Sequence, residues 1–230
     1  MSLAFDPDCR ACDRLASFLE EVKGGHPDYH CRPVAPFGDP QARLLVVGLA
    51  PGMHGANATG RPFTGDHAGI LLYETLYKCG FASAPESRHI RDGLQLKNCR
   101  ITNAVKCLPP QNKPVGSEVR ECNRFLQQEL QQLPEGGVVL ALGGIAHRAV
   151  IKATGKRQVD FPFGHAAEHD LGEGRKLLDS YHCSRYNTQT KRLTPEMFQS
   201  VFEKAADLLR QDKVVAKTSG LGDGRTMTPA

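Results

Sequence analysis

Three polar residues with different chemistry stand at or just beyond the ends of apolar segments. Asp66 follows a glycine-rich stretch, Asn103 ends the segment RITN, and His182 comes directly after the segment KLLDSY. A carboxylate can position a water molecule, an amide offers both a hydrogen-bond donor and an acceptor, and an imidazole can donate to a developing negative charge. If the three segments meet in space, these side chains form a candidate site for binding and hydrolysing a substrate.

Each of the three residues also has a simpler interpretation. Asp66 precedes apolar residues at helical spacing, and aspartate is a favoured N-cap. Asn103 is of a type that often caps a backbone, and His182 is one of nine histidines, so it can be an ordinary surface residue. The residue types alone do not decide between these roles and a catalytic site.

The stretch from Leu44 to Asp66 has the composition of a buried strand followed by a binding loop. Its first five residues, LLVVG, are apolar or glycine, which is typical of a strand buried on both faces. Glycines at 48, 52, 55, 60 and 65 leave the backbone bare, so that amide groups can approach a ligand closely. The loop also carries the flat ring of Phe63, for which packing within the loop is the simpler role.

Four of the eight cysteines are spaced as a metal site would require. Cys9 and Cys12 form a C-x2-C pair, and Cys107 and Cys122 form a wider pair around proline-rich sequence. This set suits zinc or an iron-sulfur cluster, with plain buried thiols as the alternative. The first residues, MSLAFDPDCRACDR, lack the apolar core of a signal peptide, so we expect free or metal-bound thiols rather than disulfides.

Strand and helix signals alternate along the chain, which predicts an α/β fold with a parallel sheet and helices on both faces. The predicted strands are 44–48, 100–105, 138–142 and 176–181, and the predicted helices are 13–23, 66–78, 117–133, 144–153 and one that starts at 194. We expect residues 82–98 to form a surface excursion and 155–174 to form a long loop. Ligands bind beyond the carboxyl ends of such strands, so the three polar residues should converge.

The bulk composition limits the possible classes of protein. The chain has 230 residues, for which we expect one domain over 1–212 and a disordered tail over 213–230. The net charge of +4 is compatible with a nucleic-acid partner without demonstrating one. No apolar run approaches the roughly 20 residues of a membrane span, so we expect no membrane partner and a cytoplasmic, intracellular location. The first loop lacks both the Rossmann and the P-loop glycine patterns.

Three longer motifs resemble those of one enzyme family. They are GLAPGMHGANATGRPFTGD at 48–66, ITNAVKCLPP at 101–110 and HCSRYNTQTKRLTP at 182–195. Together with the first cysteine pair, they are similar to uracil-DNA glycosylases of the iron-sulfur type, and most similar to family 5. The resemblance spans residues 9–195 and leaves the C-terminal tail outside it.

The resemblance implies a single α/β domain with a four-stranded parallel sheet between helices. It also implies a [4Fe-4S] cluster on Cys9, Cys12, Cys107 and Cys122. The implied activity is excision of uracil from DNA in base excision repair, with hypoxanthine and xanthine as further bases. We expect DNA as the partner and a monomeric enzyme.

The resemblance also assigns roles within the candidate site. Phe63 would stack on a flipped base and Asn103 would read its edge. His182 would stabilise charge on the departing base, together with loop amides near Gly48 and Ala50.

Families 4 and 5 differ in the position of the polar residue that is assigned to activate water. Family 4 carries a polar residue after the first glycine of the first motif, whereas this chain has Leu49 there, which cannot activate water. Family 5 shares this departure and uses the aspartate of the TGD segment, here Asp66. That residue would position water and stabilise the positively charged sugar.

Basic residues in the same loops would hold DNA phosphates, although each taken singly is equally an ordinary solvated charge. They are Lys106, Lys113, Arg185, Lys191 and Arg192. Two other classes of protein also fit the residues: a metal-stapled nucleic-acid-binding module without catalytic activity, and a zinc-bound α/β hydrolase that acts on a different substrate.

Overall fold

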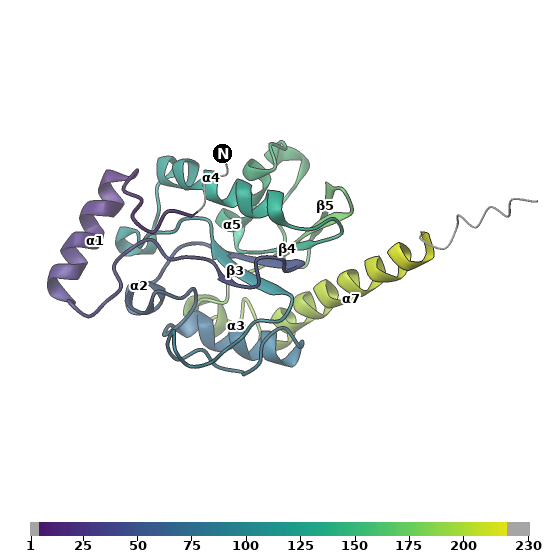
Figure 1. Cartoon of the computed structure of the whole chain (residues 1–230), viewed down its shortest axis with the longest axis horizontal. Helices are drawn as coiled ribbons and strands as arrows, with labels where there is room; N and C mark the ends of the chain where they lie inside the picture. Colours follow the sequence, from purple (N-terminus) through teal and green to yellow (C-terminus); the bar gives the residue numbers. More distant parts are fainter. Residues whose placement is uncertain (1–4, 220–230) are drawn as a thin grey trace, which may run out of the picture.

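The computed structural model describes residues 5–219, which form a six-stranded mixed sheet between layers of helices (Figure 1). The strand order is β1-β3-β2-β4-β6-β5. The strands are β1 Phe37–Gly38, β2 Leu44–Gly48, β3 Cys99–Asn103, β4 Val138–Leu142, β5 Glu168–Gly172 and β6 Arg175–Ser180. The helices are α1 Asp13–Gly25, α2 Ala56–Thr59, α3 His67–Lys78, α4 Gly116–Gln132, α5 Gly144–Ala153, α6 Arg185–Gln189 and α7 Pro195–Ser219, with short 3-10 helices at η1 Pro110–Asn112 and η2 Gln158–Asp160.

The four central strands are parallel, as the sequence predicts. β2 pairs with β3 on one side and with β4 on the other, and β4 pairs with β6. Every residue of β2 and β4 is buried, which agrees with the continuous apolar runs of these two strands. The central parallel sheet and the α/β class are therefore confirmed.

Two antiparallel edge strands were not predicted, so the strand count of four is wrong. β1 pairs with β3, and β5 pairs with β6 through a two-residue turn in which Glu173 and Gly174 both have positive φ. β5 lies within the segment 155–174 that was expected to be a loop. Its sequence, EHDLG, shows no apolar alternation because an edge strand has one partner and stays partly exposed.

The two faces of the sheet are covered by different helices. Leu44 and Val46 of β2 belong to the core cluster that includes α3 and α7, whereas Leu45 and Val47 belong to the cluster that includes α4 and α5. In Figure 1, α3 accordingly lies below the sheet while α4 and α5 lie above it. Alternating side chains of a strand point to opposite faces, so one short strand anchors both layers.

A third core cluster attaches the N-terminal helix to the end of the sheet. Leu15 and Leu19 of α1 pack with Val105 and Leu108, which follow β3, and with Phe125 of α4. The helical spacing of the apolar residues in α1 explains this single buried face. The cluster brings the first cysteine pair toward the segment that carries the second.

α7 runs to Ser219, past residue 213, where the tail was expected to begin. Residues 220–230 lie outside the described part of the chain, so disorder there stays a prediction. Within residues 5–219, no helix combines the length and the apolar character that crossing a membrane requires.

Because the central strands are parallel, their carboxyl ends share one edge of the sheet. Gly48, the last residue of β2, is in register with Asn103, the last residue of β3. The segments that follow β4 and β6 start with Gly143 and Tyr181 at the same edge. The fold therefore brings the three predicted site segments together.

Candidate active site

Gly48, Phe63 and Asn103 meet at this edge of the sheet. A Cβ atom placed on Gly48 would lie 2.4 Å from Oδ1 of Asn103 and 2.6 Å from Cζ of Phe63. No side chain tolerates such contacts, so the amide and the ring are close because position 48 has none. The convergence expected for Phe63 and Asn103 is present.

The Asn103 amide has an unusual environment. The residue is buried, and its Oδ1 atom has no hydrogen-bond partner among the described residues. Buried polar atoms are nearly always paired, and an unpaired one is often completed by a ligand. Phe63 beside it has a φ of 55°, which is strained for a bulky residue and typical of binding sites.

Asp66 is the N-cap of α3, so the helix-capping role that the sequence suggested for this residue is confirmed. Its Oδ1 atom accepts a hydrogen bond of 2.8 Å from the Gly69 amide. A Cβ atom on Gly55 would lie 2.6 Å from the other oxygen, Oδ2, so that oxygen faces the bare backbone of the loop. Burial raises the pKa of Asp66 above its usual value, against the lowering effects of the Gly69 and Ala68 amides and of His67. One cap oxygen is used and the second faces the loop, so capping and catalysis are compatible.

His182 lies on the segment after β6, close to Phe63. The two ring centroids are 6.1 Å apart and the planes are inclined by 29°. The side-chain amide of Asn187 donates a 2.8 Å hydrogen bond to the His182 carbonyl, which fixes the turn into α6. Burial lowers the pKa of His182 to about 4. The imidazole is therefore neutral at physiological pH and can donate a hydrogen bond without carrying a charge.

Ala50 lies in the loop that leaves β2, and the backbone holds this loop in place. The Gly48 and Leu49 carbonyls accept hydrogen bonds of 2.9 and 3.0 Å from the amides of Ala104 and Val105. Ala50 is a partly exposed residue, and no described residue accepts a hydrogen bond from its amide. The role of the loop amides near Gly48 and Ala50 as an anion site stays a prediction.

The loop is supported by a buried arginine that sequence reasoning missed. The Arg61 guanidinium donates to Asp92 Oδ1 at 2.8 Å, to Ser87 Oγ at 2.9 Å and to the Ile90 carbonyl at 2.9 Å. Burial alone would raise the pKa of Asp92, but hydrogen bonds from Arg61 and from backbone amides hold this pKa well below its usual range. Thr64 Oγ1 also lies 2.7 Å from Ser87 Oγ. The excursion at 82–98 therefore braces the loop, and nothing in the sequence pairs these distant residues.

The expectation that Lys106 contacts DNA is wrong. Its side chain is 1% exposed, and its ammonium group bonds to Glu129 Oε1 at 2.8 Å and to the Thr102 hydroxyl. A phosphate would have to displace a buried ion pair, whose loss leaves an uncompensated charge. Lys106 is therefore part of the core next to α4.

The other four basic residues are exposed, as a phosphate contact requires. Arg185, Lys191 and Arg192 lie on the same segment as His182, and the Arg192 guanidinium lies 4.7 Å from the centroid of the Tyr181 ring. Lys113 precedes α4, and its carbonyl accepts a hydrogen bond from Arg14. Their roles in binding DNA stay predictions.

The four paired cysteines line one small cavity between α1, α4 and the segment after β3. Cys9, Cys12, Cys107 and Cys122 are all free thiols there, next to Leu15 and Phe125. Burial, together with the neighbouring thiols, raises the pKa of Cys12 to about 11 and that of Cys107 to about 12.

Hydrogen-bond donors also reach two of these sulfur atoms. The Lys106 amide lies 3.2 Å from Cys122 Sγ, and Arg124 Nη2 lies 3.3 Å from Cys9 Sγ. Such donors stabilise thiolates, and thiolates are the form that binds metal. The set predicted from sequence is therefore assembled in space, and its chemistry fits a metal or an iron-sulfur cluster.

Comparison with known proteins points to one superfamily. A family model for the uracil DNA glycosylase superfamily matches residues 35–206, a region that contains every candidate site residue except the first two cysteines. The type-5 uracil-DNA glycosylase of Thermus thermophilus is 50% identical over 206 residues, which cover 87% of this chain and 93% of that protein. The type-5 enzyme of Mycobacterium leprae is 42% identical over 208 residues, covering 87% and 91%. A type-4 uracil-DNA glycosylase of Thermotoga maritima is 26% identical over 176 residues, covering 76% and 82%.

The environment of His182 predicts its titration. Since burial penalises the imidazolium, we expect its ring signals in NMR spectra to titrate near pH 4, whereas an unburied histidine titrates near 6.5. A short peptide with the sequence SYHCS provides the reference value, and circular dichroism checks that the protein stays folded over the range. A midpoint near that of the peptide would show that His182 is solvated and charged in mildly acidic solution.

Proposed function

Because this chain belongs to the uracil-DNA glycosylase superfamily, as a member of family 5, we propose that it excises uracil from DNA by hydrolysing the N-glycosidic bond. The observation that carries this proposal is the group of Gly48, Phe63 and Asn103, in which an unpaired amide oxygen lies beside an aromatic ring over bare backbone. A planar base with hydrogen-bonding groups on its edge matches both elements.

Recognition of the base rests on two different interactions. An enzyme of this kind must rotate the nucleotide out of the stack, which costs a few kcal/mol. Stacking on Phe63 returns part of this free energy for any base, while the Asn103 amide distinguishes bases by their edges. Removal of hypoxanthine and xanthine is part of the proposal, since stacking does not depend on the edge.

Cleavage separates positive charge on the sugar from negative charge on the base. Asp66, through the oxygen that faces the loop, positions water and stabilises the sugar cation. The neutral imidazole of His182 and the free Ala50 amide donate hydrogen bonds to the departing base. Both charges are thus compensated by groups that the fold holds in place before the reaction.

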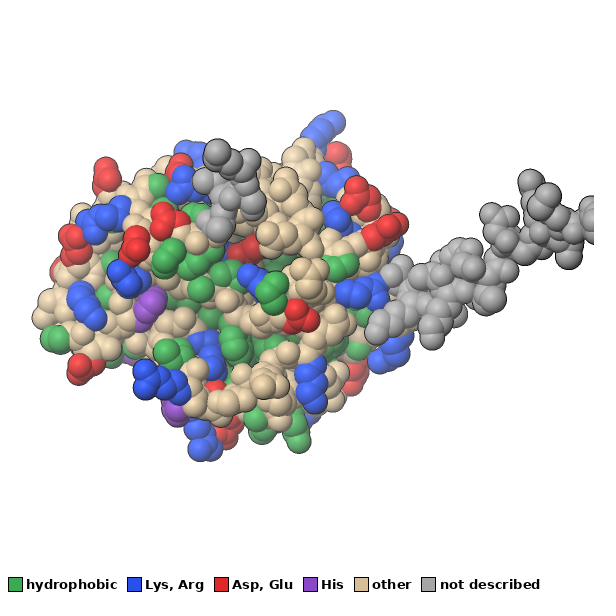
Figure 2. Space-filling model, in the orientation of Figure 1, with side chains coloured by type: hydrophobic (Ala, Val, Ile, Leu, Met, Phe, Trp, Pro, Cys, Tyr) green, Lys and Arg blue, Asp and Glu red, His purple; other side chains and the backbone are tan. Residues whose placement is uncertain are grey.

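Binding of the DNA backbone is assigned to the exposed cations near the site. On the face shown in Figure 2, Lys and Arg side chains are interspersed with Asp and Glu side chains, and the net charge of the chain is +4. Arg185, Lys191 and Arg192 share a segment with His182, so they are the candidates for the phosphates flanking a flipped nucleotide. We expect the enzyme to act as a monomer inside the cell, where its DNA substrate lies.

The four thiols are proposed to hold a [4Fe-4S] cluster whose role is structural. In the described part of the chain, no three of these sulfur atoms lie within 4.8 Å of one another. The four cysteines line one cavity, which supports a shared group held by four thiolates, and zinc is the alternative to the cluster. Cys9 and Cys12 would tie α1 to Cys107 after β3 and to Cys122 of α4.

The cluster assignment predicts the metal content of the protein. Prepared without oxygen, the protein should be brown and contain about four iron atoms per chain. Cys107→Ser should lose the iron and unfold at a lower temperature, while Cys79→Ser, at the far end of α3, should retain it. Elemental analysis that finds no iron in the wild type, or equal iron in both variants, would contradict the assignment.

The proposed activity is tested with Asp66→Asn on a uracil-containing oligonucleotide. Wild type should release uracil, whereas Asp66→Asn should retain the fold and DNA binding but slow single-turnover cleavage by roughly a hundredfold or more. Asparagine caps a helix about as well as aspartate, so a stability effect cannot account for such a loss. Glu74→Gln, at a half-exposed acid of the same helix that pairs with Lys78, is the matched control.

Two outcomes would overturn parts of this proposal. If wild type binds uracil-containing DNA without releasing the base, the chain is a binding module rather than an enzyme. If Asp66→Asn cleaves within a few-fold of wild type, Asp66 is an N-cap alone and catalysis rests on His182 and the loop amides.

A further inference from the structure

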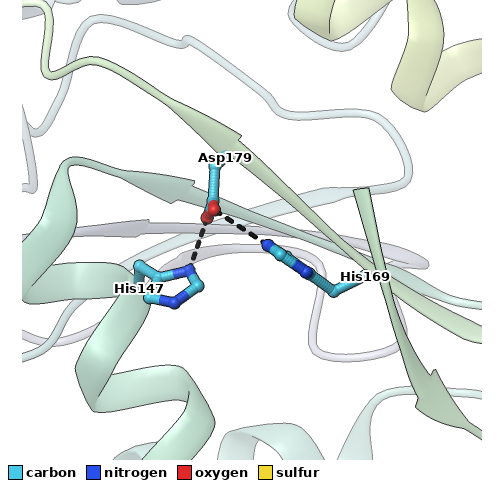
Figure 3. A group of neighbouring side chains, drawn as sticks. All are labelled: His147, His169 and Asp179. Atoms are coloured by element: carbon cyan, nitrogen blue, oxygen red, sulfur yellow. Dashed lines mark hydrogen bonds and ion pairs between the residues drawn. The ribbon is translucent and has the colours of Figure 1, made fainter. Parts of the chain in front are cut away.

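A second group of metal-binding side chains lies away from the cysteines. His147 of α5, His169 of β5 and Asp179 of β6 place their ligand atoms within 4.8 Å of one another, and Figure 3 shows the carboxylate between the two rings. The side chains of His147 and Asp179 are 1% and 0% exposed, and that of His169 is 10% exposed. Neither the motifs nor the proposed function accounts for this buried group.

The hydrogen bonds of His147 show that this group must contain an additional positive charge. Its Nε2 atom lies 2.8 Å from the Phe161 carbonyl oxygen, which can only accept, so Nε2 bears a hydrogen. Its Nδ1 atom lies 2.8 Å from Asp179 Oδ1. If both histidines are neutral and Asp179 is ionised, no hydrogen is left to lie between His147 Nδ1 and Asp179 Oδ1. Either an extra proton or a metal ion is therefore present there.

Asp179 depends on that charge for its own burial. Its other oxygen, Oδ2, lies 3.2 Å from His169 Nε2, and no Lys or Arg side chain pairs with it in the part of the chain that is described. A buried carboxylate must be paired or must coordinate a metal ion. The two imidazoles are its hydrogen-bonding partners among the described side chains, so the compensating charge, a proton or a metal ion, is held within this group.

The arrangement meets the requirements of a metal site in several respects. Two imidazole nitrogens and one carboxylate oxygen form a common zinc ligand set, and their bonds of about 2.0–2.2 Å set ligand atoms roughly 3.3 Å apart. The observed spacings are 2.8 Å from His147 Nδ1 to Oδ1 of Asp179 and 3.2 Å from His169 Nε2 to Oδ2, so they involve different oxygens of the carboxylate, and each is close to that value. The contact from His147 Nε2 to a backbone carbonyl is the outer interaction that fixes the tautomer of a ligating histidine.

We propose that His147, His169 and Asp179 bind one divalent metal ion of the zinc class. The ion enters from the side of His169, which belongs to the edge strand and is the most exposed of the three. It joins α5, β5 and β6, and Asp179 stands on the strand that leads to His182. The ion therefore stabilises the hairpin and the base of the segment that carries His182, and its binding does not depend on the proposed activity.

The test uses zinc as the probe and the protein with its native metal content. After incubation with excess ZnCl2 and gel filtration, wild type should retain about one zinc per chain with unchanged iron, and its unfolding midpoint should rise. His169→Gln should retain no zinc and show no rise. Asp179→Asn, which preserves the side-chain shape, provides a second measurement, and His89→Gln, an exposed histidine elsewhere, is the control that should match wild type.

Measuring iron and zinc together separates this site from the cysteines. Zinc that is bound equally by wild type and His169→Gln, or zinc that replaces iron, would be held elsewhere and would overturn the proposal. Wild type that retains no zinc and shows no shift in unfolding would also overturn it, and would make the triad a proton-bearing hydrogen-bond network.

Discussion

The absence of a side chain at Gly48 is the constraint on which the candidate site depends. It stands at the carboxyl end of the central strand β2, in register with Asn103, and Phe63 returns to the same point from the end of the loop. Because no Cβ separates them, the ring and the amide form one surface over bare backbone. The positive φ of Phe63 and the unpaired oxygen of Asn103 both occur at this point, which is the kind of place where binding sites hold strained residues.

Buried ion pairs around this surface hold its residues in place, and burial affects the charge of the residues beside it. The ion pair between Arg61 and Asp92 fixes the outer side of the loop, and the ion pair between Lys106 and Glu129 lies in the core next to β3. Burial lowers the pKa of His182 to about 4, so its imidazole is neutral, and burial raises the pKa of Asp66 above its usual value. The charges that develop during cleavage therefore meet fixed donors and a carboxylate in a partly water-excluded site.

The sequence predicted the elements that carry a strong periodic signal and missed those that depend on distant partners. The central strands were predictable because LLVVG and VVLAL are unbroken apolar runs, and α7 because Thr194 and Pro195 mark its start. β5 was not predictable, because a partly exposed edge strand has no unbroken apolar run. Lys106 was misassigned because a lysine that follows a strand gives the same sequence signal whether its side chain contacts a phosphate or a buried glutamate. The pairs Arg61–Asp92 and His147–Asp179 could not be found, because their members are 31 and 32 residues apart in the sequence, and His169 lies in the edge strand that was not predicted. The cysteine set was predicted by spacing and resemblance together, and the cavity now brings its members to one place.

The most direct test of the account is single-turnover uracil excision by Gly48→Ala, with Gly24→Ala as control because a Cβ there meets no other atom within 4 Å. One added methyl group must displace the Asn103 amide or the Phe63 ring, so we expect cleavage to fall by roughly a hundredfold, the scale that an ångström of misplacement produces. The iron content and the overall circular dichroism spectrum should be unchanged. Excision by Gly48→Ala at the rate of the control would contradict the central claim that the ring and the amide at this glycine form the base-binding surface.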